Sequence, residues 1–183
     1  GLWIIEDACH APGASFEDSN GEFQKSGNGK FADLAIFSFH PVKHIATGEG
    51  GMITTNSEIL YNKLLLLRSH GITRDQSRFR NSIIQAGGNS SDSMYPGWYM
   101  EMQELGYNYR LTDFQAALGI SQLKKIEGNL SRRKEIAKYY DLAFQNQSRI
   151  KSQGFEIGLN SSGHAYHLYV IQTEDRLGLY NYL

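Results

Sequence analysis

The chain has 183 residues, of which 40% are hydrophobic, 20% charged and 12% aromatic, with 19 glycines and only 3 prolines. This composition is that of a soluble globular protein and excludes disorder and collagen-like repeats. Its 18 Lys and Arg residues balance 19 Asp and Glu residues, so the charge favours neither nucleic acid nor a membrane as partner. The single cysteine, Cys9, fits a reducing compartment, and we expect a cytoplasmic protein.

Both ends of the sequence lie within apolar segments. The chain enters the apolar run at residues 2–5 at once, and residues 176–183 form an apolar-periodic segment without a helix stop signal. We therefore expect a piece of a longer protein, truncated at both ends, whose strands pair with strands outside it.

Strands are predicted at three places in the first third of the chain. Residues 2–5 form a continuous apolar run, typical of a strand covered on both faces, and the acidic pair Glu6-Asp7 ends it. After a polar stretch, residues 33–39 form a second apolar strand. A loop with a glycine-rich segment follows, and residues 52–55 favour a third strand.

A helix and a long irregular segment are predicted next. Asn56 or Ser57 can cap a helix whose apolar residues recur at three- and four-residue intervals, and Gly71 would close it. Residues 72–111 contain too many Gly, Ser, Asn and Arg residues for regular structure. A loop of that length in a compact domain is usually functional.

Two helices and a strand are predicted in the last third. A capping-box pattern at Thr112 opens the first helix, which Gly128-Asn129 would break. The second helix is expected over residues 131–144, and residues 165–173 favour a strand. A helical connection followed by a smaller sheet indicates a second domain.

Three features in chain order indicate anion and cofactor handling. Asp7 ends a strand, Ser38 and Lys43 are spaced as Ser-x-x-x-x-Lys after another strand, and a glycine-rich loop at 47–51 follows the lysine. Each feature alone has an ordinary structural explanation: a salt-bridge carboxylate, a solvated lysine and a turn. Their combination is what suggests a site.

Metal and hydrolase sites are less consistent with the residues. His40 and His44 are four residues apart, and His10 follows Cys9, which raises the possibility of a metal site. Pro41 and the glycine-rich turn argue against a helix there, and only one thiol is available, so no metal site is predicted. Ser38 lacks the flanking glycines of a nucleophile elbow, which argues against hydrolase chemistry.

Four motifs together resemble a known family. They are Glu-Asp-Ala-Cys-His-Ala at 6–11, Phe-Ser-Phe-His-Pro-Val-Lys at 37–43, Gly-Glu-Gly-Gly at 48–51 and Gly-Tyr-Asn-Tyr-Arg at 106–110. In this order they resemble the DegT/DnrJ/EryC1/StrS family of pyridoxal-phosphate sugar aminotransferases. The segments at 70–74, 98–103 and 164–169 look most like the transaminases of pseudaminic acid biosynthesis.

The resemblance implies an α/β fold, that of the fold-type I pyridoxal-phosphate-dependent transferases, which are aspartate aminotransferase-like. A mixed, mainly parallel sheet would belong to the large domain, followed by the start of a small α+β domain. Residues 1–128 would be the C-terminal part of the cofactor-binding large domain, and residues 129–183 the connecting helix and the beginning of the small C-terminal domain. Members are longer than this chain, so we expect the isolated chain to be inactive.

The resemblance also implies a role for each site residue. Lys43 would bind pyridoxal 5'-phosphate covalently and carry protons between the donor Cα and the cofactor. Asp7 would face the pyridine nitrogen and keep the ring protonated. His10 would lie near the phenolic oxygen of the ring, and Ser38 would hydrogen-bond the phosphate. Asn108 would reach the phosphate of the neighbouring subunit's cofactor, so a homodimer would share its active sites.

The function implied is transamination of a UDP-linked 4-keto-6-deoxy-N-acetylhexosamine with L-glutamate as amino donor, in pseudaminic acid biosynthesis. Two alternatives stay open: another nucleotide-linked keto sugar, of dTDP, bacillosamine or perosamine type, or a non-catalytic dimerising module of the same fold. Dehydratase relatives have histidine at the position of Lys43, so the lysine argues against that reaction. The resemblance assigns no firm role to Glu49, Tyr107, Tyr109 or Arg110.

Overall fold

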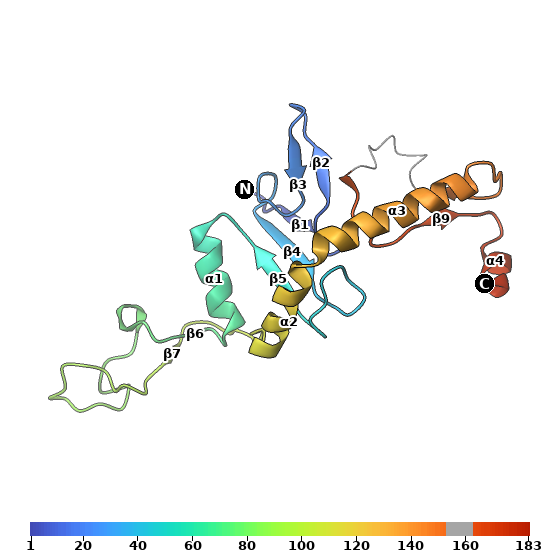
Figure 1. Ribbon diagram of the computed structural model, residues 1–183. Helices are drawn as coiled ribbons and strands as arrows, with labels where there is room; N and C mark the ends of the chain where they lie inside the picture. Colours follow the sequence, from blue (N-terminus) through green and yellow to red (C-terminus); the bar gives the residue numbers. More distant parts are fainter. Residues whose placement is uncertain (153–162) are drawn as a thin grey trace. The chain divides into compact units, whose positions relative to one another are not determined.

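The computed structural model describes residues 1–152 and 163–183 (Figure 1). They divide into two compact units, one formed by residues 1–54 with 113–183 and the other by residues 55–112. The first unit contains a three-stranded sheet and the helices α2, α3 and α4. The second contains the helix α1 and a long excursion of the chain.

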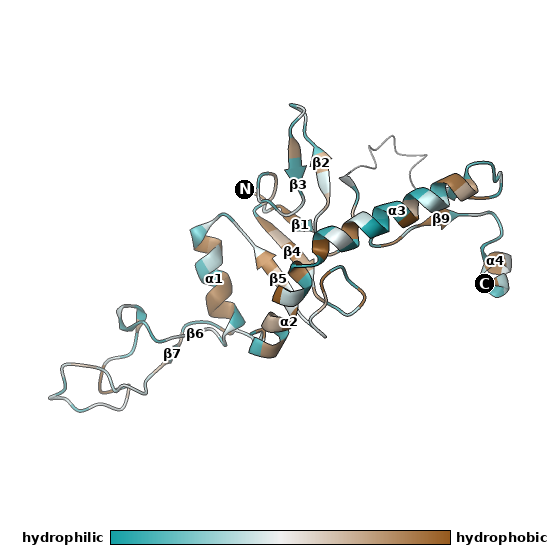
Figure 2. Cartoon of the chain, viewed as in Figure 1, coloured by the Kyte–Doolittle hydropathy of each residue, from teal (hydrophilic) through white to brown (hydrophobic). Residues whose placement is uncertain are grey.

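The sheet of the first unit has the strand order β1-β4-β5. β1 (Ile5–Asp7) runs parallel to β4 (Leu34–Ser38), and β5 (Gly51–Thr54) pairs antiparallel with β4. β4 and β5 are brown in Figure 2, as expected for strands rich in apolar residues. The predicted second and third strands and the mixed character of the sheet are thus confirmed.

The first strand is later and more exposed than predicted. β1 begins at Ile5, so the acidic pair lies within the strand, and Leu2 and Trp3 before it are 97% and 67% exposed. The prediction of a strand at 2–5 covered on both faces was wrong in this respect, because β1 lies at the edge of the sheet and pairs with β4 alone. The buried apolar residues nearby are small, Ala8 and Ala35, which lets the two strands and their loops approach closely.

A hairpin occupies the polar stretch between β1 and β4. β2 (Ser15–Glu17) and β3 (Phe23–Lys25) pair antiparallel. The Asp18 carboxylate orders the turn. It accepts hydrogen bonds from the N–H groups of Asn20 and Glu22 and forms an ion pair with Lys30 at 2.9 Å. The hydrogen bond from Lys30, with those from the turn, lowers the pKa of Asp18 to about 2. This hairpin was not predicted, because local propensity favours a loop and the ordering contact joins residues twelve apart.

The helical part of the first unit differs from the prediction at its break. α2 (Asp113–Leu123) ends before Lys124, and α3 (Ile126–Phe144) runs straight through Gly128 and Asn129. The break predicted at Gly128-Asn129 was therefore wrong, because glycine inside a helix costs only about 1 kcal/mol relative to alanine and packing can offset that cost. A domain boundary between residues 128 and 129 stays a prediction.

Short elements complete the first unit. β8 (Lys151–Ser152) pairs antiparallel with β9 (Ile171–Gln172), and α4 is Arg176–Tyr182. Of the strand predicted over 165–173, only β9 is paired, since the residues before it contact α3 and the loop after β4 through side chains and carbonyl groups. Within residues 1–152 and 163–183, every helix is too short or too polar to cross a membrane.

In the second unit, α1 (Glu58–Arg68) begins and ends as the sequence predicts. The Ser57 hydroxyl accepts the N–H of Leu60, which caps the helix. The N–H of Gly71 donates to the Leu66 carbonyl oxygen at 2.9 Å, and Gly71 has a φ of +68°. A Cβ at Gly71 would collide with the Glu104 carbonyl oxygen, so glycine is required there for the chain 103–109 to pack against the end of α1.

The long segment after α1 is mostly irregular, as predicted, but it is ordered around one carboxylate. β6 (Ile72–Thr73) pairs with β7 (Glu101–Met102), and the 3-10 helix η1 (Gln76–Arg78) lies between them in sequence. Glu101 is 6% exposed and accepts hydrogen bonds from four groups. These donors are the N–H groups of Arg80 and Asn81, the Tyr99 hydroxyl and the Gln103 amide.

Replacing Glu101 with glutamine is expected to destabilise this excursion. Burial raises the pKa of Glu101, but the hydrogen bonds, led by that from Asn81, outweigh it and hold the pKa below the ordinary value of 4.5. A lowered pKa gives stability that is present above pH 4.5 and lost as pH falls through the native value. Glu101→Gln should lower the unfolding temperature of the full-length protein at pH 7 by several degrees. The unfolding temperature of the variant should also fall less steeply than that of the wild type as the pH is lowered.

Glu104→Gln is the matched control, because this partly exposed carboxylate of the same unit pairs with Lys63 at the surface. Surface ion pairs contribute little to stability, so the control should change the unfolding temperature less. Equal unfolding temperatures and acid profiles for the two variants, measured by circular dichroism, would contradict the role of Glu101.

Candidate active site

Asp7 presents an ionised carboxylate at the carboxyl end of β1. Its Oδ1 accepts the N–H of Cys9 at 3.0 Å. The Cys9 thiol lies near the same carboxylate and 3.8 Å from the Ile36 carbonyl oxygen, so its proton has two acceptors. Hydrogen bonding from the Cys9 thiol and N–H lowers the pKa of Asp7, and the charges of His10 and Lys43 lower it further. Asp7 is exposed and therefore available to a ligand.

Lys43 lies in a closed loop between β4 and β5. Phe39 closes the loop through its backbone: its N–H donates to Gly50 at 2.8 Å, and its carbonyl oxygen accepts from Thr47 at 2.9 Å. The N–H of Lys43 donates to the His40 carbonyl oxygen at 2.9 Å and forms a turn. The buried residues that anchor this loop are His44, Ile45 and Thr47.

The charge of Lys43 acts on residues that are distant in the sequence. Hydrogen bonding from Cys9 is the main cause that lowers the pKa of Asp7, and burial is the main cause that lowers the pKa of His167; the positive charge of Lys43 lowers both further. The pKa of Cys9 is raised, chiefly by burial. The effect of the Lys43 charge requires proximity, because charge interactions are screened within about 8–10 Å at physiological salt. Because β1 and β4 run parallel, Asp7 and the start of the Lys43 loop lie at one edge of the sheet. A joint site of Asp7 and Lys43 stays a prediction.

Ser38 ends β4 opposite Gly51 of β5. The Ser38 hydroxyl accepts the N–H of His40 at 3.4 Å, so it lies at the start of the lysine loop. A Cβ at Gly51 would lie 2.8 Å from the Phe37 carbonyl oxygen, so a side chain there would push the strands apart. The glycine keeps the end of β4 beside the loop.

Glu49 contributes to this loop through its backbone. Its carbonyl oxygen accepts from the Thr47 hydroxyl and from the Gln115 amide, both at 2.8 Å. Its side chain is 74% exposed and lies 3.8 Å from Nε2 of His40. The contact through Gln115 ties the glycine-rich segment to the start of α2.

A cluster of histidines lies beside Lys43. The ring of His10 packs on that of His167 with centroids 4.1 Å apart, and the rings of His44 and His167 are 5.4 Å apart. Burial, then the positive charges of His10 and Lys43, lower the pKa of His167 to about 4, so it is neutral at physiological pH. Residues 1–152 and 163–183 contain no group of three His, Cys, Asp or Glu side chains placed to hold a metal ion.

Asn108 lies in the second unit, where the chain runs along the end of α1. It forms an isolated antiparallel bridge with Ser69. The flanking Tyr107 and Tyr109 donate their N–H groups to the Leu67 and Arg68 carbonyl oxygens at 2.7 and 3.0 Å. Their rings stack at 4.8 Å, so alternation along the extended chain places the exposed Asn108 side chain on the opposite side.

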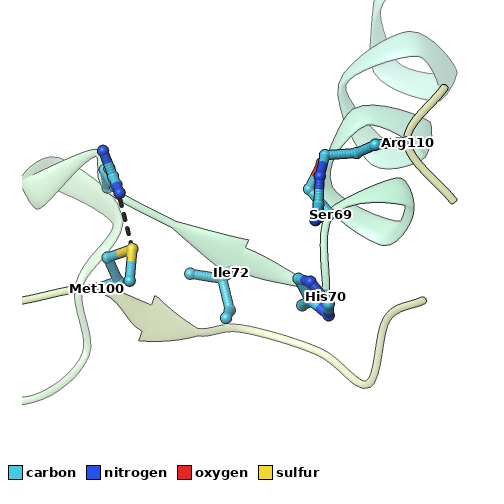
Figure 3. Close-up of a pocket in the computed structure, with 6 residues that line it drawn as sticks. Ser69, His70, Ile72, Met100 and Arg110 are labelled. Atoms are coloured by element: carbon cyan, nitrogen blue, oxygen red, sulfur yellow. Dashed lines mark hydrogen bonds between the residues drawn. The ribbon is translucent and has the colours of Figure 1, made fainter. Parts of the chain in front are cut away.

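A hollow of about 350 Å³ lies beside this bridge in the second unit. Figure 3 shows Arg110, Ser69 and His70 on one side of it, Met100 on the other and Ile72 between them. Arg74, which also lines the hollow, donates through Nε to the Met100 sulfur at 3.1 Å, the dashed line in the figure. Its charged lining residues are all basic, so it favours anions.

The chain matches the model of the DegT/DnrJ/EryC1/StrS aminotransferase family over residues 1–181. It belongs to this family. The resemblance drawn from the four sequence motifs is therefore confirmed.

Relatives of this DegT/DnrJ/EryC1/StrS chain include named transaminases. The "UDP-4-amino-4,6-dideoxy-N-acetyl-beta-L-altrosamine transaminase" of Campylobacter jejuni is 42% identical over 166 residues, which cover 89% of this chain and 36% of the relative. Helicobacter pylori PseC, described as an aminotransferase involved in the biosynthesis of pseudoaminic acid, has a TM-score of 0.74 at 29% identity. That match covers 100% of this chain and 41% of PseC.

A putative sugar aminotransferase, Spr1654 of Streptococcus pneumoniae, matches in its PLP-form with a TM-score of 0.69 and 29% identity, covering 94% of this chain and 38% of that one. The chain thus spans well under half the length of the relatives it matches. These structures confirm the predicted fold class, the α/β fold of the fold-type I transferases.

Four of the predicted site residues of this DegT/DnrJ/EryC1/StrS chain lie in the first unit: Asp7, His10, Ser38 and Lys43. Asn108 lies in the other unit. The sequence does not predict the interaction of His10 with His167, although the segment 164–169 resembles the family. The one feature of the sequence that pointed to this interaction was the presence of His164 and His167 in the segment. Two nearby histidines do not reveal which distant ring either of them contacts in the fold.

Proposed function

We propose that the full-length protein is a pyridoxal-phosphate-dependent aminotransferase of nucleotide-linked keto sugars. The observation that carries this proposal is the parallel pairing of β1 and β4, which places Asp7 and the start of the Lys43 loop at one edge of the sheet in a member of this family. An acid at the end of β1 and an amine in the loop after β4 suit the ring nitrogen and the aldehyde carbon of the cofactor.

The residues of the first unit fit the cofactor. The lowered pKa of Asp7 keeps its carboxylate charged beside a protonated ring nitrogen. Ser38 offers a hydroxyl donor for the phosphate at the start of the Lys43 loop. When bound, pyridoxal phosphate withdraws electron density from the donor Cα. Lys43 would hold the cofactor covalently and then move the proton from the donor Cα.

Asn108 supports a homodimer with shared active sites. Its side chain is exposed, and backbone hydrogen bonds to the end of α1 hold the segment that carries it. A rigidly held amide at the surface suits a contact with the phosphate of a cofactor in the partner subunit.

For the substrate, we propose a UDP-linked 4-keto-6-deoxy-N-acetylhexosamine with L-glutamate as donor, in pseudaminic acid biosynthesis. The names of the Campylobacter and Helicobacter relatives support this choice. The basic side chains of His70, Arg74 and Arg110 beside the hollow suit an anionic group such as a diphosphate. The free Cys9 is in keeping with a reducing cytoplasm.

The test uses the purified full-length protein with pyridoxal phosphate, L-glutamate and a panel of UDP- and dTDP-linked 4-keto sugars. We expect aminated UDP-sugar and 2-oxoglutarate, identified by mass spectrometry. Amination of a dTDP-sugar alone would change the substrate and keep the reaction. If no sugar is aminated and borohydride treatment gives no pyridoxyl adduct, the aminotransferase proposal is wrong and the alternative of a non-catalytic module of the same fold is supported.

A further inference from the structure

Hydrogen bonds from α3 and from the Lys43 loop hold the backbone of the segment around His167. Arg133 of α3 donates through Nη1 to the carbonyl oxygens of Tyr166 and His167 at 3.0 and 3.3 Å. The His44 ring makes a hydrogen bond of 2.9 Å to the carbonyl oxygen of Ala165. These contacts link the segment to α3 and to the Lys43 loop, so the backbone that carries His167 has little freedom to move.

The side chain of His167 ends against His10. Its ring centroid lies 4.1 Å from that of His10, with the planes inclined at 42°. The Nδ1 atom of His167 is buried and has no hydrogen-bond partner among the described residues 1–152 and 163–183. Among the described residues, the Nδ1 edge of the His167 ring therefore packs against His10 and forms no hydrogen bond.

The charges around the pair make a neutral His167 necessary. The charged and titratable groups that face it are Lys43 and His44 from the loop, His10 after β1, and Arg133 from α3. A protonated His167 would add a positive charge to this group. Burial and these neighbours hold its pKa near 4, so a neutral ring packs on His10 without charge repulsion.

His10 itself is exposed and follows a short strand. An exposed side chain samples several rotamers unless a neighbour restricts it. We propose that His167 is a positioning residue: its ring holds the His10 side chain in the one orientation that this ring contact allows. This inference rests on the proposed function, since it assigns His10 to the cofactor ring, and it names a residue that acts on the cofactor only through His10.

The test measures the pH midpoint of the visible absorption band of the bound cofactor in the full-length protein. Displacement of His10 changes the hydrogen bonding of the cofactor ring, so His167→Ala should shift this midpoint by about half a pH unit or more. His167→Phe retains a planar ring and should restore the wild-type midpoint. His10→Ala should shift the midpoint as His167→Ala does, and the double variant should add nothing further, because both act through one side chain.

His164→Ala is the matched control. This exposed histidine lies on the same segment and accepts the N–H of Tyr166, but its ring contacts Tyr166 and not His10. It should leave the midpoint unchanged even if it lowers the unfolding temperature. A wild-type midpoint in His167→Ala, or additive shifts in the double variant, would overturn the inference and leave the proposed function intact. A wild-type protein without any cofactor band would overturn both.

Discussion

Lys43→Arg in the full-length protein is expected to abolish transamination and to leave no covalent pyridoxyl adduct after borohydride treatment. Arginine stays protonated at all accessible pH values, so it can neither bind the cofactor carbon covalently nor accept the proton from the donor Cα. Loss of acid–base catalysis alone costs about 100- to 10,000-fold in rate. Loss of covalent attachment comes in addition, so the residual rate should fall below detection in a steady-state assay.

The fold should survive this substitution. The loop that carries Lys43 is closed by backbone hydrogen bonds of Phe39 and anchored by buried neighbours, and the lysine side chain contributes to neither. Lys30→Arg is the control, because Lys30 pairs with Asp18 in the hairpin, where arginine can replace it. An adduct that persists in Lys43→Arg, mapped by mass spectrometry to another lysine, would remove Lys43 from its proposed role.

The sequence predicts best where a segment decides its own structure. β4 is a continuous apolar run, and α1 has a serine cap at one end and a glycine at the other, so local propensity and packing agree. The family motifs predict that an acid and a lysine belong to one site, and the structure places Asp7 and the start of the Lys43 loop at one edge of the sheet. That agreement comes from β1 and β4 running parallel, which places their carboxyl ends at one edge.

Long-range partners were not predictable in the same way. Glu101 accepts N–H groups from residues 20 and 21 positions earlier, and nothing local in the sequence marks a glutamate as buried. His44 bonds a carbonyl oxygen 121 positions away, and this contact brings His167 to the site. Local patterns also misplaced the break between α2 and α3, because the Gly128-Asn129 pair predicts a turn only where packing does not hold the helix.

The other large effect is expected for Asp7→Asn, which should lower the rate of transamination by about 100- to 1,000-fold while the cofactor stays attached to Lys43. The amide is neutral and cannot hold a proton on the ring nitrogen through charge, so the ring becomes a weaker electron acceptor. The asparagine oxygen can still accept the N–H of Cys9, as Asp7 does at 3.0 Å, so the local backbone should not change.

Two measurements separate this electrostatic effect from misfolding. A borohydride-trapped adduct in Asp7→Asn shows that the cofactor is bound, and the matched variant Asp33→Asn tests a second carboxylate that accepts a backbone N–H beside β1, from Ile4 at 2.8 Å. Asp33→Asn should keep the wild-type rate.

Because the pKa of Asp7 is held below its ordinary value of 3.8, the carboxylate stays charged throughout the pH range above that value. The ratio of wild-type to Asp7→Asn rates should therefore stay constant from pH 6 to 9, and a rate within a few-fold of wild type would show that the ring nitrogen does not depend on this carboxylate.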